Sequence, residues 1–233
     1  MKSKTYRLDR FISQHSDYSM SDVRLLIAQQ RILLDGKPAQ SAHQQVMQFT
    51  HVLLDDVCLN DQQPVYIMLH KPKGVVCATK DDQHSTVLDL ITHPKKDELH
   101  IVGRLDLNTT GLVLLTNDGQ WSRKISLPET KLVKTYEVTL SKPLNEEYCK
   151  AFREGIFFRY EGITTQPAHL EILTDYTARL ALTEGKYHQV KRMFGYFRNE
   201  VLALHRSSVG HISLNGLVEG ESRLLTPQEA ILE

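Results

Sequence analysis

Short apolar segments at close spacing run through the sequence from residue 65 onward, and this spacing is the strongest constraint on its fold. The segments are often joined by turn residues, so we expect them to pair into a largely antiparallel sheet. Three helices are expected between or after them, at 145–154, 187–197 and 227–232. The sequence therefore predicts an α+β fold, with strands at VYIML (65–69), LHIVG (99–103), GLVLLT (111–116), LVKTYEVTL (132–140), AHLEIL (168–173) and ARLALT (178–183).

The first sixty residues show a different pattern of predicted helices and strands. Residues 7–31 carry two apolar stripes at helical spacing, and Ser19 followed by Asp22 resembles a helix start. The stretch RILLDGKPA then predicts a strand, a hairpin turn at Asp35-Gly36 and a returning strand, and HVLLDD predicts another strand. The composition turns polar at CLNDQQP, where Asp55, Asp56 and Asp61 gather near Pro64. We predict a small domain at 1–60, a linker at 61–64 and a second domain at 65–233.

Composition excludes several classes of protein. With 233 residues, 41% hydrophobic and 24% charged, the chain has the make-up of a globular protein of about two domains. No apolar run approaches the ~20 residues of a membrane span, and the N-terminus has no apolar stretch typical of a secretory signal. Three widely spaced cysteines without a CxxC pair argue against disulfides and zinc. We expect a cytoplasmic protein that binds no metal and no membrane.

The charges are balanced in sum but not in position. There are 28 basic and 28 acidic side chains, which by itself argues against a nucleic-acid partner. Basic residues nevertheless outnumber acidic ones in three regions: 1–50, 121–134 and 186–206. Three such clusters favour a polyanionic partner.

The stretch GRLDLNTTGLVLLTNDG, residues 103–119, places Asp106 shortly before the strand predicted at 111–116. Asp106 could be a metal ligand, a general base or a covalent nucleophile. A metal site is disfavoured, because the segment offers only Thr and Asn as further ligands. A sheltered carboxylate needs a cation to stay charged, and Arg104, Lys191 and Arg192 are candidates. Alternatively, Asp106 only shapes the loop together with Thr109 and Thr110.

These residues resemble the signature of the pseudouridine synthases of the RsuA type, which modify ribosomal RNA. Four further stretches match that family in the same order: HKPKGVVCAT (70–79), KTYEVTL (134–140), EGKYHQVKRMF (184–194) and LHRSSVG (204–210). The first sixty residues resemble an S4 domain, an RNA-binding fold. The resemblance covers nearly the whole chain, and it implies an S4-like domain followed by a pseudouridine synthase domain.

The resemblance also implies roles for individual residues. Asp106 matches the essential aspartate, Tyr136 the active-site tyrosine and Lys191 the basic partner of the aspartate. An aromatic in a strand core is the alternative for Tyr136, and a solvated helix face is the alternative for Lys191. Binding of substrate or RNA is expected from a wider set of residues: Arg104, Thr109, Thr110, Arg192, Lys71, Arg24, Arg31, His205 and Arg206.

The implied reaction is the isomerisation of a uridine without a cofactor. Asp106 would act at the ribose C1′ of a flipped-out uridine, by direct attack or by elimination to a glycal, and attack at C6 of the base is a third route. One residue departs from the family pattern, since Met20 stands where relatives often carry arginine. With the zero net charge, this departure predicts weak binding to naked RNA.

The sequence resembles the small-subunit branch of the family more than the large-subunit branch. We therefore expect the target to lie in 16S ribosomal RNA, free or within an early small-subunit assembly intermediate, and nothing demands more than a monomer. The alternatives are the same chemistry on 23S ribosomal RNA and a non-catalytic S4-type assembly factor. A glycoside hydrolase is disfavoured, because it normally needs a second carboxylate.

Overall fold

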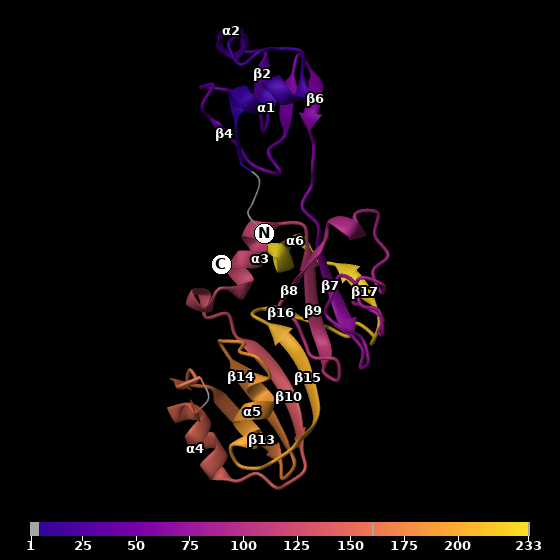
Figure 1. Cartoon of the computed structure of the whole chain (residues 1–233), viewed down its shortest axis with the longest axis vertical. Coiled ribbons are helices and arrows are strands. Elements are labelled where there is room, and N and C mark those ends of the chain that lie inside the picture. The colour runs from indigo at the N-terminus through magenta and orange to yellow at the C-terminus, as the bar shows by residue number, and fades with distance from the viewer. Residues whose placement is uncertain (1–4, 160, 233) are drawn as a thin grey trace. The chain divides into compact units, whose positions relative to one another are not determined.

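A computed structural model describes residues 5–159 and 161–232 of the chain (Figure 1). The main chain divides after Pro64 into a small N-terminal unit and a larger C-terminal unit. Residues 61–64 form neither helix nor strand. No helix in the described ranges is long and apolar enough to span a membrane.

The N-terminal unit packs two short helices and two small sheets around one apolar core. Its turn at Asp35-Gly36 has φ values of 51° and 76°, which is the left-handed geometry that a two-residue hairpin requires. The core draws on both helices and on the strands, for example through Leu8, Leu26 and Val52. The elements are β1 (Tyr6–Arg7), α1 (Leu8–His15), α2 (Val23–Ala28), β2 (Ile32–Leu34), β3 (Lys37–Pro38), β4 (Gln45–Val46), β5 (Val52–Leu54) and β6 (Val57–Asn60), with sheet orders β3-β2-β5-β6 and β1-β4.

Two acids expected near the linker lie inside this unit instead. Asp55 and Asp56 have φ values of 50° and 65° and form the two-residue turn between β5 and β6. The Asp55 carboxylate accepts a hydrogen bond from Nε of Arg31 at 2.6 Å, and Nη2 of Arg31 donates to the Tyr18 hydroxyl at 2.6 Å. Arg31, predicted to bind RNA, therefore has its charge matched within the unit, whereas Arg24 on α2 is exposed.

The C-terminal unit is built on a mixed sheet that is mostly antiparallel, which confirms the predicted α+β class. Within the described residues the sheet has nine strands, seven of them in the order β13-β14-β10-β15-β9-β7-β17, with β16 beside β15 and β8 beside β9. The strands are β7 (Tyr66–Lys71), β8 (His100–Val102), β9 (Thr110–Thr116), β10 (Lys134–Leu140), β13 (His169–Thr174), β14 (Thr177–Leu182), β15 (Val201–Val209), β16 (Ile212–Ser213) and β17 (Ser222–Leu224); β11 (Phe157–Phe158) and β12 (Ile163–Thr164) pair separately.

Helices cover both faces of this sheet, which explains why β9 is apolar without alternation. Val113 and Leu115 belong to the core that includes α4 and α5, while Leu112 and Leu114 belong to the core that includes α3. Each fully buried leucine of this kind contributes roughly 2–3 kcal/mol. Figure 1 shows α4 and α5 beside β13, β14 and β10. The helices are α3 (Gly119–Ser126), α4 (Glu146–Glu154), α5 (Gln189–Gly195) and α6 (Pro227–Ala230), with 3-10 turns η1 (Lys96–Glu98) and η2 (Pro128–Thr130).

Several elements of this unit were not predicted from the sequence, among them one helix and one long strand of the sheet. Helix α3 was not predicted, although Trp121 and Ile125 lie one turn apart on its buried side. Strand β15 was not predicted either, because its polar residues obscure the pattern of a central strand. The expected helix at 187–197 begins later, at Gln189, since His188 has a left-handed backbone with φ 48°.

The one parallel strand pair among the described residues joins β9 to β15, with Thr110 opposite His205 and Gly111 opposite Arg206. Gly111 has φ 112°, and a Cβ atom placed there would lie 2.3 Å from the carbonyl oxygen of Arg206. Only glycine allows the two backbones to approach so closely.

We expect Gly111→Ala to lower the free energy of unfolding by at least about 2 kcal/mol, because the new methyl group overlaps rigid backbone. Gly74→Ala is the matched control, since Gly74 also has a positive φ, 82°, but faces open space. Urea denaturation followed by circular dichroism measures both. Equal losses for the two variants would contradict the close-approach argument.

Candidate active site

Asp106 lies in the loop 103–109 between β8 and β9, and a buried lysine holds the main chain of this loop. Lys71, the last residue of β7, is fully buried. Burial lowers the pKa of the Lys71 ammonium, but three carbonyl acceptors satisfy all of its N–H donors and favour the charged form. Its Nζ donates to the carbonyl oxygens of Pro72 (2.9 Å), Leu107 (3.2 Å) and Thr109 (2.7 Å).

Arg206 holds the other end of the same loop. Its side chain comes from β15 and the residue is only 3% exposed. Nη2 donates to the carbonyl oxygen of Gly103 at 2.6 Å, and Nε donates to that of Leu112 at 2.8 Å. The amide of Leu105 donates to Sγ of Cys77 at 3.2 Å. The backbone on both sides of Asp106 is therefore fixed by buried groups.

Three residues assigned to RNA binding from the sequence thus have a different place. Lys71 and Arg206 direct their charges at main-chain carbonyls, and Thr109 is 1% exposed. All three side chains are buried, and those of Lys71 and Arg206 hold the loop, so their direct contact with RNA stays a prediction. A sequence reveals the charge of a side chain but not the carbonyl oxygens that surround it.

The carboxylate of Asp106 points toward two cationic or polar groups at the start of α5. Nζ of Lys191 lies 3.2 Å from Oδ2, as the predicted pairing requires, and Nε2 of His188 lies 3.4 Å from Oδ1. The Asp106 side chain is 31% exposed, so it is held but accessible. His188 was not among the predicted site residues, although its spacing of three from Lys191 places both on one side of a helix start.

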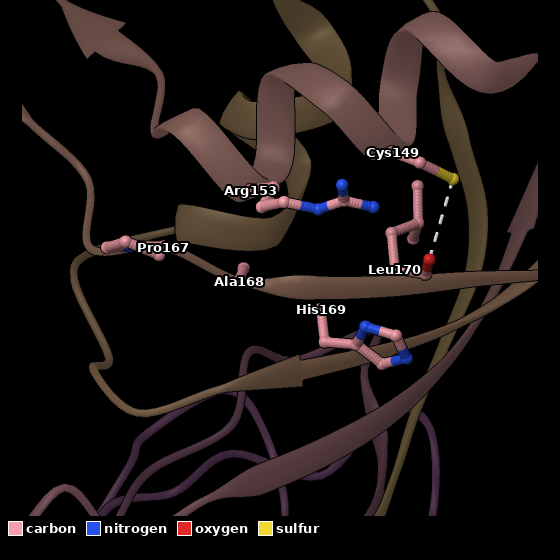
Figure 2. Close-up of a pocket in the computed structure, with 6 residues that line it drawn as sticks. All are labelled: Cys149, Arg153, Pro167, Ala168, His169 and Leu170. Carbon is pink, nitrogen blue, oxygen red and sulfur yellow. Dashed lines mark hydrogen bonds between the residues drawn. The ribbon is translucent and has the colours of Figure 1, made fainter.

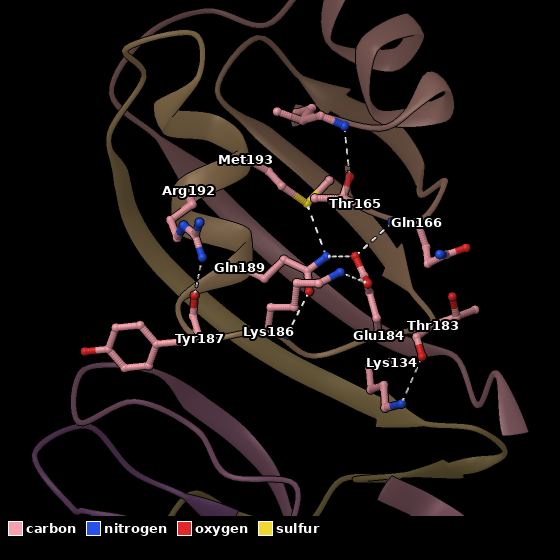
Figure 3. Close-up of polar contacts among 11 residues, drawn as sticks. Lys134, Thr165, Gln166, Thr183, Glu184, Lys186, Tyr187, Gln189, Arg192 and Met193 are labelled. Atoms are coloured by element: carbon pink, nitrogen blue, oxygen red, sulfur yellow. Dashed lines mark hydrogen bonds and ion pairs between the residues drawn. The ribbon is translucent and has the colours of Figure 1, made fainter. Parts of the chain in front are cut away.

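A buried carboxylate fixes the segment that carries His188 and Lys191 (Figure 3). Glu184 is 9% exposed. Its Oε1 accepts hydrogen bonds from the main-chain N–H of Gln166 at 2.9 Å and from the side-chain Nε2 of Gln189 at 2.5 Å. Oε1 of Gln189 in turn accepts from the amide of Lys186 at 2.8 Å, and the Lys186 ammonium pairs with Glu184. These bonds close the loop on itself and set where α5 begins.

The two arginines considered near Asp106 are placed differently. Arg104 is exposed beside it. Arg192 forms an ion pair with Glu161 at 2.5 Å, lies 3.8 Å above the ring of Phe158, and donates to the carbonyl oxygen of Tyr187 at 3.3 Å. Arg192 therefore stabilises the local fold, while Arg104 remains accessible.

Thr110 and His205 contact each other across the parallel strand pair. The Thr110 hydroxyl lies 2.9 Å from Nδ1 of His205. Burial lowers the pKa of His205, and the nearby ring of His70, at a centroid distance of 5.2 Å, lowers it further. Both effects favour the neutral form of the imidazole.

Tyr136 lies on β10 and is 8% exposed. It belongs to the same apolar core as Leu105 and Val190, the chain neighbours of Asp106 and Lys191 respectively. Tyr136 is therefore packed in the apolar core together with the chain neighbours of Asp106 and Lys191.

A separate hollow of about 270 Å³ lies between α4 and β13 (Figure 2). The thiol of Cys149 donates to the carbonyl oxygen of Leu170 at its edge. None of the predicted site residues lines this hollow, whose walls are Cys149, Arg153, Pro167, Ala168, His169 and Leu170.

Comparisons with known proteins show which family this chain is similar to. The family model for RNA pseudouridylate synthase matches residues 65–196. The chain is 48% identical to ribosomal small subunit pseudouridine synthase A of Pseudomonas aeruginosa, over 96% of this chain and 98% of that protein. It is 42% identical to the protein of the same name from Escherichia coli, over 96% and 97%. A crystal structure of a pseudouridylate synthase matches with a TM-score of 0.69 and 42% identity, over 96% and 97% of the two chains.

The resemblance inferred from five ordered motifs is confirmed by relatives that match along nearly the whole length. The matched region contains Asp106, Tyr136 and Lys191. This chain belongs to the RNA pseudouridylate synthase family.

Proposed function

We propose that this protein converts one uridine of 16S ribosomal RNA into pseudouridine, with Asp106 acting at C1′ of the ribose. The observation that carries the proposal is the arrangement of Asp106, whose backbone is fixed by buried cations and whose carboxylate is paired with Lys191 at 3.2 Å. The small-subunit names of the relatives support the class of RNA.

The reaction rearranges bonds within one nucleotide and needs no external reactant. Attack of the Asp106 carboxylate on C1′ breaks the C1′–N1 bond and leaves its electron pair on the uracil. The uracil turns, C5 bonds to C1′ and the carboxylate leaves. The C5 proton is lost and N1 gains a proton, so the composition is unchanged. In the elimination route, Asp106 removes a ribose proton instead and a glycal forms.

Each neighbour of Asp106 has a role in this scheme. The Lys191 ammonium favours the ionised carboxylate that either route requires. Tyr136, which matches the active-site tyrosine of the family, is proposed to take the C5 proton. Arg104, exposed beside the loop, can hold a phosphate of the flipped-out nucleotide. Unstacking that nucleotide costs a few kcal/mol, which contacts in the pocket must offset.

The N-terminal unit is proposed to be an S4-like RNA-binding domain of limited affinity. Met20, at the position where relatives often carry arginine, is 53% exposed. Arg31 is paired with Asp55, which leaves Arg24 as the accessible cation among the residues predicted there. Few phosphate contacts mean a shallow salt dependence. We propose that a cytoplasmic monomer acts on an early small-subunit assembly intermediate in which the RNA is already folded.

Asp106→Asn should abolish the reaction, with a loss of at least about 1000-fold in rate, because the amide keeps the shape of the side chain but loses its nucleophilic charge. The assay is pseudouridine mapping by carbodiimide labelling and primer extension on unmodified 16S RNA, free and bound by early assembly proteins. Asp97→Asn makes the same substitution at an exposed residue in η1 and is the control; it should keep the activity of the wild type.

The pattern of stops separates the alternatives. One new stop on 16S RNA that is lost in Asp106→Asn supports the proposal and identifies the target. A stop on 23S RNA alone would replace the substrate but keep the chemistry. RNA binding without any stop would leave the role of a non-catalytic assembly factor.

Glu184→Ala should lower kcat by roughly 10- to 100-fold with little change in KM, because His188 and Lys191 lose their fixed position while RNA contacts remain. Glu184→Gln keeps one acceptor oxygen, which can replace Oε1, and should recover part of this loss. Glu171→Ala removes an exposed, paired carboxylate from β13 and is the control. A rise in KM with unchanged kcat for Glu184→Ala would contradict the positioning role.

A further inference from the structure

An exposed aromatic ring lies one side chain away from Asp106. Tyr187 is 76% exposed, the largest exposed fraction among the large apolar and aromatic side chains that the structure describes. In Figure 3 its ring points away from the polar network around Glu184. A single exposed aromatic residue is common on a protein surface, so exposure alone does not assign it a role.

The ring of Tyr187 is held in place from one side. It stacks on the ring of His188 with a centroid distance of 3.9 Å and an interplanar angle of 19°. The main-chain carbonyl of Tyr187 accepts a hydrogen bond from Arg192 at 3.3 Å. The segment is further fixed by Gln189 through Glu184. One face of the tyrosine ring is therefore covered and oriented, and the opposite face is open.

The stacked rings of Tyr187 and His188 lie close to the carboxylate of Asp106. Nε2 of His188 lies 3.4 Å from Asp106, while the flat side of the same imidazole carries Tyr187. A uridine bound with C1′ at Asp106 therefore places the adjoining part of its RNA strand near the tyrosine.

We propose that the open face of Tyr187 stacks with the base of the nucleotide next to the target uridine in the same RNA strand. The proposal rests on the proposed function and adds a binding site for a second nucleobase. Stacking on an aromatic ring accepts any base, because every base has a π face. By holding the neighbouring base, the tyrosine would prevent that base from moving into the space that the flipped-out uridine has left in the stack.

The test compares three variants on unmodified 16S RNA and on a short transcript that contains the mapped site. Tyr187→Ala should lower kcat/KM by roughly 5- to 100-fold, the range measured for the loss of one base–aromatic stack. Tyr187→Phe keeps the ring and should restore most of this loss. Tyr196→Ala removes another exposed tyrosine, 63% exposed at the far end of α5, and should match the wild type.

Abasic nucleotides distinguish stacking from a mere effect on His188. Removing the base on one side of the target should lower kcat/KM for the wild type by the same factor as Tyr187→Ala. The two changes combined should cost no more than either alone. The inference would be overturned if the loss from the abasic site multiplied with the loss from Tyr187→Ala, whichever side of the target lacked its base. It would also be overturned if the Tyr187→Phe variant were as impaired as Tyr187→Ala.

The outcome also separates this inference from the proposed function. An active wild type with an unimpaired Tyr187→Ala variant overturns the stacking platform and leaves the proposed reaction intact. A wild type that forms no pseudouridine overturns both.

Discussion

Two buried cations fix the loop that carries Asp106. The ammonium of Lys71 and the guanidinium of Arg206 both end on main-chain carbonyls, at Leu107 and Thr109 in one case and at Gly103 in the other. A buried charge is costly unless its hydrogen-bonding capacity is satisfied. The loop can meet that demand only in a conformation that turns these carbonyls inward, so the two cations and the loop determine each other.

The opposite side of the site is fixed by an anion. Glu184 gathers a main-chain amide, a side-chain amide and an ammonium, and thereby sets the start of α5. Buried cations thus fix the loop of Asp106, and a buried anion fixes the helix start that carries Lys191. The two side chains form their ion pair between these fixed segments. Preorganisation of this kind places charge where a reaction needs it, without movement during the reaction. The open edge of the site is left to Arg104 and to the stacked rings of Tyr187 and His188.

Much of this could be predicted from the sequence, and the failures have a common cause. The α+β class, the hairpin at Asp35-Gly36 and the pairing of Asp106 with Lys191 follow from local pattern or motif. The carbonyl partners of Lys71 and Arg206 could not be predicted, because a positive side chain in a motif suggests a phosphate and these backbone atoms come mostly from distant segments. Strand β15 was missed since its buried arginine interrupts the apolar pattern of a central strand. His188 could have been found, because it stands three residues before Lys191.

The parallel contact between β9 and β15 joins residues nearly a hundred positions apart, with Gly111 against Arg206. Such distant contacts form late in folding, because a long loop must close before they stabilise anything. Ribosomal synthesis proceeds from the N-terminus, so Lys71 and Asp106 emerge long before the arginine that completes their loop. The loop of Asp106 therefore lacks its Arg206 contact until strand β15 has left the ribosome, the particle whose RNA this protein is proposed to modify.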